Sequence, residues 1–259
     1  MIHNFENKTV VIFGASQGIG LASAHKFCEY GAHVFLAARS LSVIEKEANR
    51  LTNLGYKASA LSCDISQFKS VEACIEEATK NSNLDFVINS AGTIDPLSTL
   101  IDSDPAAWAH AVDVNVKGAY HAIRASAPVM RSQGFGTIVS LSSGAANSVL
   151  EGWSHYCSTK AAAKKLTEVA NKELSQYNIN VIGLSPGTVA TKMMAKIRDA
   201  KINVVSNLDW SAHISPEAVA IALAYLCGPD GKKFAGTDFS LKTEEGKNLV
   251  GLNKLGAIE

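Results

Sequence analysis

Short apolar stretches alternate with helical patterns along almost the whole chain. Seven of these stretches are four to six residues long, and several are rich in Val and Ile, as expected of strands buried on both faces. They are residues 9–13, 34–38, 58–62, 86–89, 137–141, 180–184 and, with a weaker pattern, 237–241.

Segments with helical signals separate the strands. They are residues 19–30, 40–54, 105–131 and 155–176, followed by a helix that begins near residue 216. Asp104 and Ser215 each precede a proline, which matches a helix N-cap and first helical position, and Ser40 opens another helix. Gly31 and Gly55 follow two helices as plausible C-terminal stops.

Regular alternation of strands and helices predicts an α/β fold. We expect a doubly wound, Rossmann-type, seven-stranded parallel sheet with helices on both faces. The chain has 259 residues and no repeat or linker divides it, so residues 1–259 are expected to form a single domain. The stretch 191–215 interrupts the pattern and is a candidate substrate lid.

Composition and charge exclude several classes of protein. The 24 basic and 24 acidic side chains give a formal net charge of zero, so the basic surface of a nucleic-acid-binding protein is not expected. The five cysteines form no CxxC pair and suit reduced thiols, and no metal-ligand spacing occurs. With neither a signal-peptide pattern nor a membrane-spanning apolar stretch, we expect a soluble, cytoplasmic protein without membrane partners.

A glycine-rich turn follows the first strand and opens the first helix. In GASQGIG, Gly14, Gly18 and Gly20 would let the backbone pass close to a pyrophosphate at the helix N-terminus. The spacing is GxxxGxG, and an ordinary tight turn is the alternative. Its position between a strand and a helix favours dinucleotide binding.

The end of the second strand bears on the choice between NAD and NADP. An acidic residue there would bind ribose hydroxyls and repel a 2′-phosphate, but this chain has Arg39 and Ser40 after Ala38. Arg39 could give the phosphate a charge-assisted contact, whereas the alternative is a solvated arginine. NADP(H) is therefore the preferred cofactor, with NAD(H) as the alternative.

Tyr156 and Lys160 lie four residues apart on a predicted helix and so share one face. A lysine ammonium close to a phenol favours the phenolate: at 4 Å and an effective dielectric of 20 the interaction is worth ~4 kcal/mol, about three pKa units. We therefore expect a lowered Tyr156 pKa, suited to proton transfer. Taken alone, a surface pair is the more ordinary interpretation.

Ser143 lies just after the fifth strand, where the loops of a parallel sheet gather functional groups. Its hydroxyl could orient a substrate oxygen, although, taken alone, a serine in LSSGAA is more often a turn residue. It has no GxSxG context and no His–Asp partners, which argues against a hydrolase.

Taken in chain order, these motifs resemble those of the short-chain dehydrogenase/reductase family, in its compact single-domain branch. The resemblance covers nearly the whole chain and rests on residues 14–20, residues 62–64, residues 89–92, Asn115, Ser143, Tyr156, Lys160, residues 185–187 and Thr191. Phe13 and Ser90 are small departures from the family motifs. Two departures matter more: Gln17 replaces the basic residue frequent in NADP-preferring members, and residues 236–252 differ from the usual GxxxxVDGG ending.

The resemblance implies a role for each matching residue. Tyr156 would donate the proton in reduction and accept it in oxidation, Lys160 would bind the nicotinamide ribose and lower the tyrosine pKa, Ser143 would position the carbonyl, and Asn115 would hold a water relay to Lys160. The expected cofactor-binding residues are Gly14, Ser16, Gln17, Gly18, Ile19, Gly20, Arg39, Ser40, Asp64, Ile65, Asn89, Ala91, Gly92, Tyr156, Lys160, Pro186, Gly187, Val189 and Thr191.

The sequence therefore predicts an NADP(H)-dependent oxidoreductase that interconverts a small ketone or aldehyde and an alcohol. A 3-oxoacyl-carrier-protein reductase, with Arg124 and Arg131 as candidate docking cations, and a non-catalytic NADP(H)-sensing regulator remain as alternatives. By analogy with the family, a homodimer or homotetramer is expected.

Several neighbours of the motifs also carry expectations. We expect Trp153, Met193 and Met194 to line the pocket or to pack in the core. His155 is expected on the surface and Cys157 as a small packed side chain.

Overall fold

Seven parallel strands form one sheet in the order β3-β2-β1-β4-β5-β6-β7. The computed structural model describes residues 3–252. The strands are β1 (Thr9–Phe13), β2 (His33–Ala38), β3 (Lys57–Ser62), β4 (Phe86–Asn89), β5 (Gly136–Leu141), β6 (Ile179–Ser185) and β7 (Asp238–Ser240). This arrangement confirms the predicted doubly wound sheet, and every strand lies within one or two residues of its predicted position.

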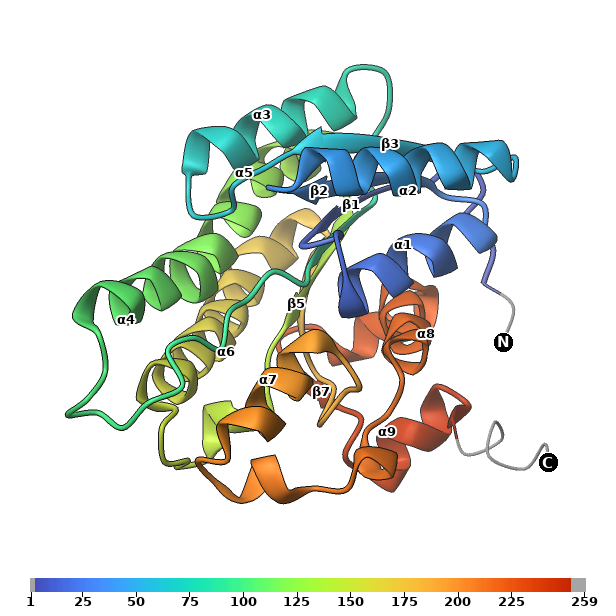
Figure 1. Ribbon diagram of the computed structural model, residues 1–259. Coiled ribbons are helices and arrows are strands. Elements are labelled where there is room, and N and C mark those ends of the chain that lie inside the picture. Colours follow the sequence, from blue (N-terminus) through green and yellow to red (C-terminus); the bar gives the residue numbers. More distant parts are fainter. Residues whose placement is uncertain (1–2, 253–259) are drawn as a thin grey trace.

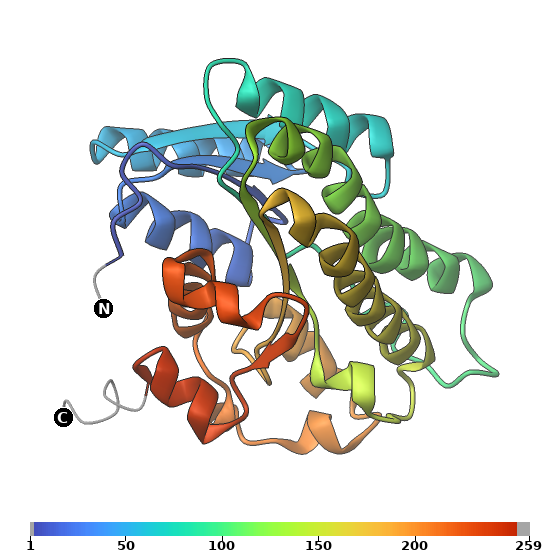
Figure 2. The same cartoon turned by 180° about the vertical axis from the view of Figure 1, so that it is seen from behind.

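Helices cover both faces of the sheet, as Figures 1 and 2 show from opposite sides. They are α1 (Gly18–Glu29), α2 (Leu41–Asn53), α3 (Phe68–Thr79), α4 (Pro105–Val112), α5 (Gly118–Gln133), α6 (Ser154–Leu174), α7 (Lys192–Ala200), α8 (Pro216–Cys227) and α9 (Glu244–Leu249). One buried apolar cluster joins α1, α2 and α8 to the sheet, and a second joins α3, α5 and α6 to its other face. The alternating side chains of each strand therefore serve two cores.

The predicted caps explain where two helices begin. Asp104 accepts hydrogen bonds from the amides of Ala106 and Ala107 at the start of α4. Ser215 accepts one from Ala218 at the start of α8. Ser40 is the N-cap of α2, as expected, but its side chain makes no capping hydrogen bond.

The long helix predicted over residues 105–131 is interrupted. Between α4 and α5 the backbone forms a π-helical turn at Asp113–Lys117, so one extra residue is inserted into the helix. Such turns occur mostly as single insertions and are frequent at functional sites. The turn contains Asn115, which is buried.

The stretch 191–215 is more regular than its sequence indicates. It contains α7 and the short 3-10 turns Val204–Asn207 and Trp210–Ala212. Thr191 starts α7, because its hydroxyl accepts a hydrogen bond from the amide of Met194 at 3.4 Å. Within residues 3–252, no helix is long and apolar enough to cross a membrane.

The sheet changes direction of winding between β1 and β4. These two strands pair side by side, with Phe13 opposite Asn89, but the chain leaves them toward opposite ends of the sheet. In open α/β sheets, ligands bind in the crevice outside the carboxyl ends of the strands at such a switch point. Predicted site residues follow the carboxyl ends of β1 to β6, so the fold brings them to the same edge of the sheet as this crevice.

Candidate active site

The glycine turn after β1 has little room for any side chain. Gly14 has a φ of +79°, and a Cβ there would lie 2.7 Å from the backbone nitrogen of Ala91 in the loop after β4. A Cβ on Gly20 would lie 2.3 Å from the carbonyl oxygen of Gly14. Gly20 therefore lets α1 pack closely against the end of β1. The two glycines bring the turn, the helix and the neighbouring loop into contact.

A cavity of about 640 Å³ opens beside this turn, at the switch point of the sheet. Twelve of the residues expected to bind the cofactor line it: Gly14, Ser16, Gln17, Gly18, Ile19, Arg39, Ser40, Asp64, Ile65, Ala91, Gly92 and Thr191. They come from five separate segments of the chain. The sequence motifs therefore converge on one space of the size found for cofactor sites.

Arg39 and Asp64 give this cavity opposite charges at the ends of β2 and β3. Asp64 accepts hydrogen bonds from the amide and the hydroxyl of Ser66, at 3.0 and 2.7 Å. Burial alone would raise the pKa of Asp64, but the bonds from Ser66 and the positive charge of Arg39 hold that pKa below its usual value. The carboxylate therefore stays ionised and in a fixed orientation at neutral pH.

A second cavity, of about 280 Å³, continues from the first. The two share Ile19, Ser90, Gly92, Thr191 and Met193 as lining residues. Ser143, Tyr156 and Lys160 line the second cavity, together with the expected residues Pro186, Gly187 and Val189. A ligand in the first cavity can thus meet a molecule in the second beside the serine, tyrosine and lysine.

The pKa values of Tyr156 and Lys160 differ from the sequence-based expectation. Both side chains are buried, and Lys160 Nζ lies 5.7 Å from the centroid of the Tyr156 ring. Burial raises the pKa of Tyr156 to about 12, although a hydrogen bond with Ser143 acts in the opposite direction. Burial also lowers the pKa of Lys160 to about 8. The expected lowering of the tyrosine pKa is therefore wrong for this structure, because desolvation penalises the charged form of each group.

Hydrogen bonds hold Lys160 and Asn115 close to Gly92. Lys160 Nζ donates to the carbonyl oxygen of Leu141 at 2.8 Å, at the end of β5. A Cβ on Gly92 would lie 3.4 Å from Asn115 Oδ1 and 3.7 Å from Lys160 Nζ. The bare glycine thus leaves both polar groups close to the junction of the two cavities.

The amide of Asn115 is used within the protein. Its Oδ1 accepts a hydrogen bond from the Thr93 amide at 2.9 Å, and its Nδ2 donates to the Thr93 carbonyl and to Thr159 Oγ1 at 3.0 and 3.1 Å. Asn115 therefore ties the loop after β4 to α6. Within the described residues it lines neither cavity, and the same holds for Gly20 and Asn89.

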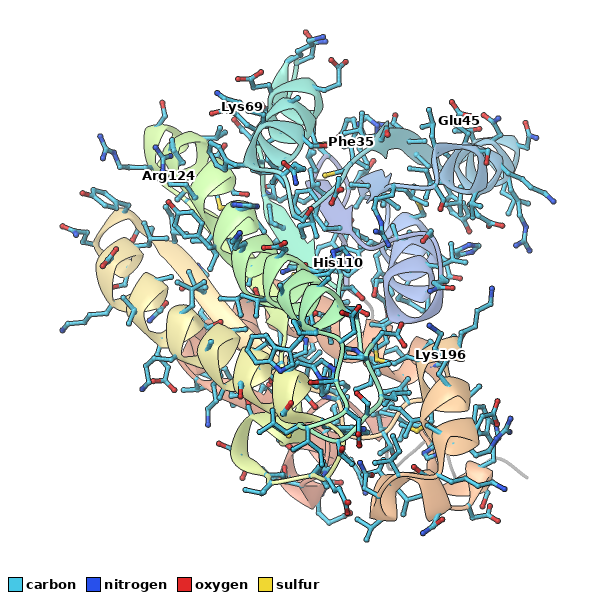
Figure 3. The ribbon with its side chains drawn as sticks, turned by 60° about the vertical axis from the view of Figure 1, so that its left-hand side comes forward. Phe35, Glu45, Lys69, His110, Arg124 and Lys196 are labelled. Carbon is cyan, nitrogen blue, oxygen red and sulfur yellow. The ribbon has the colours of Figure 1, made fainter. Side chains whose placement is uncertain are left out.

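Sequence reasoning missed other residues that line the two cavities. Ser90 borders both cavities, although only the adjacent Asn89, Ala91 and Gly92 were expected to bind the cofactor. His110 and Lys192 border the first cavity, and Lys242 borders the second. His110 comes from α4 (Figure 3), which a loop brings over the crevice. None of these three polar residues belongs to a recognisable motif, so only the fold locates them.

The neighbours of Tyr156 differ in their positions. Trp153, Met193 and Met194 were expected either to line the pocket or to pack in the core, and all three line the second cavity. Cys157 is half-buried and packs against an apolar cluster that includes Trp153 and Met194. His155 is 1% exposed, and its Nε2 lies 2.7 Å from the carbonyl oxygen of Ile94. The expected surface position of His155 is wrong, because this carbonyl, from a loop distant in sequence, holds the ring inside.

Comparison with known proteins places the chain among oxidoreductases. The family model described as short chain dehydrogenase matches residues 8–202. An uncharacterized oxidoreductase of Staphylococcus saprophyticus is 34% identical over 227 residues, which are 86% of this chain and 91% of the relative. The sequence similarity thus extends over most of both proteins.

Solved structures share the fold. A 3-oxoacyl-[acyl-carrier protein] reductase from Brucella melitensis has a TM-score of 0.82 and 27% identity, and the match covers 93% of this chain and 92% of that one. A 7 alpha-hydroxysteroid dehydrogenase, complexed with NADH and 7-oxo glycochenodeoxycholic acid, has a TM-score of 0.79 and 25% identity, covering 92% and 94%.

The parallel sheet and the divided cleft at its switch point define a doubly wound α/β protein of the dinucleotide-binding kind. The chain belongs to the short-chain dehydrogenase family. It is therefore an oxidoreductase of the kind that acts on CH–OH or C=O groups of small molecules.

Proposed function

We propose that this chain is an NADP(H)-dependent enzyme that interconverts a ketone or aldehyde and an alcohol, with Tyr156 as acid and base. The observation that carries the proposal is the meeting of Ser143, Tyr156 and Lys160 in one cavity, directly beside the cavity that follows the glycine turn. A hydroxyl pair and an amine in a largely apolar space are the groups needed to activate a carbonyl oxygen.

The residues around the first cavity fit a dinucleotide. Gly14 leaves no space for a side chain. Gly18 has a φ of +56°, and among the described residues only the side chain of Thr191 lies within 4 Å of its Cβ position. The turn thus presents bare backbone to the cavity, which suits the approach of a pyrophosphate. Asp64 is oriented to accept hydrogen bonds, and Arg39 provides the positive charge that favours the 2′-phosphate of NADP.

In this proposal the nicotinamide ring, when bound, supplies hydride to the carbonyl carbon or accepts it from the alcohol carbon. Ser143 donates a hydrogen bond to the carbonyl oxygen, and Tyr156 gives its proton to the same oxygen as negative charge develops there. With a pKa raised to about 12, the phenol is fully protonated at neutral pH, which suits a proton donor. In oxidation the proton moves the other way, from the alcohol to the phenolate.

Lys160 stabilises the phenolate that remains after the proton has left. At the 5.7 Å that separates Lys160 Nζ from the ring centroid, an effective dielectric of about 20 gives an attraction of about 3 kcal/mol. Lys160 needs its positive charge for this role. Asn115 acts indirectly, because its bonds to Thr93 and Thr159 hold the loop and the helix that carry the site together.

We also propose that the segment 191–215 acts as a lid. Met194 and Ile197 of α7 line the second cavity, and Lys196 of the same helix pairs with Asp95 in the loop after β4 at 2.8 Å. This ion pair is exposed, so a small free-energy difference suffices to open it. Such a lid would exclude water while hydride moves.

The remaining parts of the proposal concern assembly and location. We propose that the protein works in the cytoplasm as a homodimer or homotetramer, in which α5 and α6 pair with those of another copy. Tyr120 on α5 and Val169 on α6 are exposed, although both are large and apolar. Such side chains suit a surface that another protein covers.

The similarity to a 3-oxoacyl-[acyl-carrier protein] reductase supports a second candidate substrate, an acyl thioester. Its carrier protein would need a basic docking surface. Arg124 lies over the ring of Phe68 and Arg131 over that of Tyr177. In Figure 3, Arg124 projects from α5 well away from Lys196 of α7, the helix whose Met194 and Ile197 line the second cavity. The small-ketone reading is therefore preferred.

Steady-state oxidation of NADPH by the purified chain tests the proposal. A panel of small ketones, aldehydes and acetoacetyl thioesters should include at least one ketone or aldehyde that is reduced. Turnover of thioesters alone would instead support the carrier-protein reductase. NADPH binding without turnover of any member would overturn the enzymatic proposal and favour a regulator that senses the cofactor.

A further inference from the structure

Among residues 3–252, the second cavity is lined by lysine side chains but by no acidic side chain. The lysines are Lys160 and Lys242. Lys160 is buried and bonded to the Leu141 carbonyl. Lys242 has no assigned role, and it falls in the segment 236–252 that departs from the family pattern.

The end of β7 brings Lys242 over the site. Ser240 pairs with Ser185 of β6, so the residues that follow β7 run beside Pro186 and Gly187. A Cβ on Gly187 would lie 3.3 Å from Lys242 Cγ, and a Cβ on Gly144 would lie 3.2 Å from Lys242 Nζ. The aliphatic part of Lys242 thus passes over Gly187, and its ammonium group lies close to Gly144. Gly144 directly follows Ser143, so the ammonium is one residue from the hydroxyl proposed to hold the carbonyl.

No carboxylate neutralises this ammonium within the part of the chain that the structure describes. The ion pairs among residues 3–252 do not include Lys242, which is exposed. The nearby Glu244 pairs with Lys247 at 2.8 Å. Asp238 lies two residues before Ser240 and accepts a hydrogen bond from Ser142. The positive charge of Lys242 is therefore available to a molecule in the cavity.

Most of the remaining wall of the cavity is apolar, and its polar part, among residues 3–252, is made of neutral serine and threonine residues. Leu150, Trp153, Met194, Ile197 and Val205 line it. A molecule that fits must combine an apolar body with a group that satisfies one ammonium. A carboxylate carries one negative charge and accepts hydrogen bonds from an ammonium, whereas a neutral group gains much less from it.

We propose that Lys242 selects substrates that carry a carboxylate, so that the enzyme acts on an oxo acid or the corresponding hydroxy acid. This inference rests on the proposed function for the reaction itself. Ser143 and Tyr156 hold the reacting oxygen, the apolar wall takes the carbon skeleton, and Lys242 binds the carboxylate near the mouth of the cavity. The volume of about 280 Å³ suits a small or medium-sized acid.

Calorimetric titration of the full chain with matched ligands tests this proposal without requiring turnover. The probes are para-acetylbenzoate and para-acetylbenzamide, and levulinate and levulinamide, each pair differing only in the charge of one group. We expect each carboxylate to bind about ten-fold more tightly than its amide, as one charge-assisted hydrogen bond allows. The preference should weaken at high salt, because Lys242 is exposed.

Three variants identify the lysine responsible. Lys242→Met should remove the preference for the carboxylate, while Lys242→Arg should keep most of it. Lys232→Met is the matched control, since Lys232 is also exposed but lines neither cavity. It should behave like the wild type.

Equal or absent binding of acid and amide by the wild type would overturn the proposal. A preference that survives in Lys242→Met, or that Lys232→Met also loses, would do the same. If the carboxylate preference depends on Lys242 but no carbonyl compound is reduced, the anion site stands and the proposed reaction fails. The two failures can thus be told apart.

Discussion

Burial favours the neutral form of Lys160, whereas the proposed reaction requires its charged form. Burial in the second cavity lowers the pKa of this amine to about 8, although the negative charge of Asp238 acts in the opposite direction. The same burial keeps the Tyr156 phenol protonated. The proposed chemistry needs the charged ammonium beside the tyrosine, so the site works only where the lysine still holds its proton.

This balance predicts how the rate of reduction depends on pH. Below pH 8 Lys160 is mostly protonated, and above it the charge is lost, so kcat/KM for the carbonyl substrate should fall as the pH rises through about 8. Tyr156, with a pKa of about 12, stays protonated over this range. Steady-state kinetics between pH 6 and 10 measure the profile. The residual activity of Lys160→Met should lack this break, and a flat wild-type profile would contradict the role of the lysine charge.

Arg39 sets the proposed preference for NADP(H). It lines the first cavity near the end of β2, and its charge also acts on Asp64. Replacing Arg39 by Ala should raise KM for NADPH at least ten-fold, the loss expected for a charge-assisted hydrogen bond to phosphate. KM for NADH should change less than about two-fold and serves as the internal control. Equal changes for both cofactors would show that Arg39 does not bind the 2′-phosphate.

At the scale of elements, the turn between β1 and α1 depends on contact with the loop after β4. Gly14 and Gly55 both have positive φ values, +79° and +90°. A Cβ on Gly14 would lie within 3 Å of the backbone of Ala91, whereas a Cβ on Gly55 would have no atom of residues 3–252 within 4 Å. An alanine at Gly55 would therefore meet backbone strain alone, whereas an alanine at Gly14 would meet both strain and steric overlap.

Alanine at each position should have a different cost. Gly55→Ala should lower the free energy of unfolding by about 1–2 kcal/mol, the cost of a left-handed conformation for a residue with a Cβ. Gly14→Ala carries the same strain and must also displace the loop after β4, so it should lower the free energy of unfolding clearly more than Gly55→Ala. Urea-induced unfolding measures both losses. Equal losses would contradict the tight contact between the turn and the loop.

Elements were predictable from the sequence where burial or a cap leaves a pattern. The central strands could be found because both of their faces are buried, and α4 and α8 could be found from Asp104 and Ser215. Helix α3 begins after Gln67, whose side chain forms no cap, so its start carries no such signal. The π-helical turn around Asn115 inserts only one residue, too little to disturb the hydrophobic period.

At the scale of the whole molecule, the parallel sheet gathers segments that are distant in sequence. The meeting of Ser143, Tyr156 and Lys160 in one cavity could be predicted, because each lies in a short motif. The pKa values could not, since they depend on how much of the surrounding protein excludes water. The positions of His155 and Lys242 also depend on distant segments, the loop at Ile94 and the glycines near the ends of β5 and β6.

The two cavities explain why one substitution can separate binding from chemistry. Tyr156 lines the second cavity but not the first, where Arg39, Asp64 and the glycine turn lie. Removing its hydroxyl leaves the ring in place and should leave the first cavity unchanged. Cofactor binding and proton transfer can therefore be measured independently in the same variant.

The central claim is that Tyr156 supplies the proton for carbonyl reduction. The most direct test is the turnover number of Tyr156→Phe with NADPH and a carbonyl compound that the wild type reduces, measured together with the Kd for NADPH. We predict that kcat falls at least a hundred-fold, as expected for the loss of a general acid, while Kd changes less than about two-fold. A variant that retains more than a tenth of the wild-type kcat would contradict the claim.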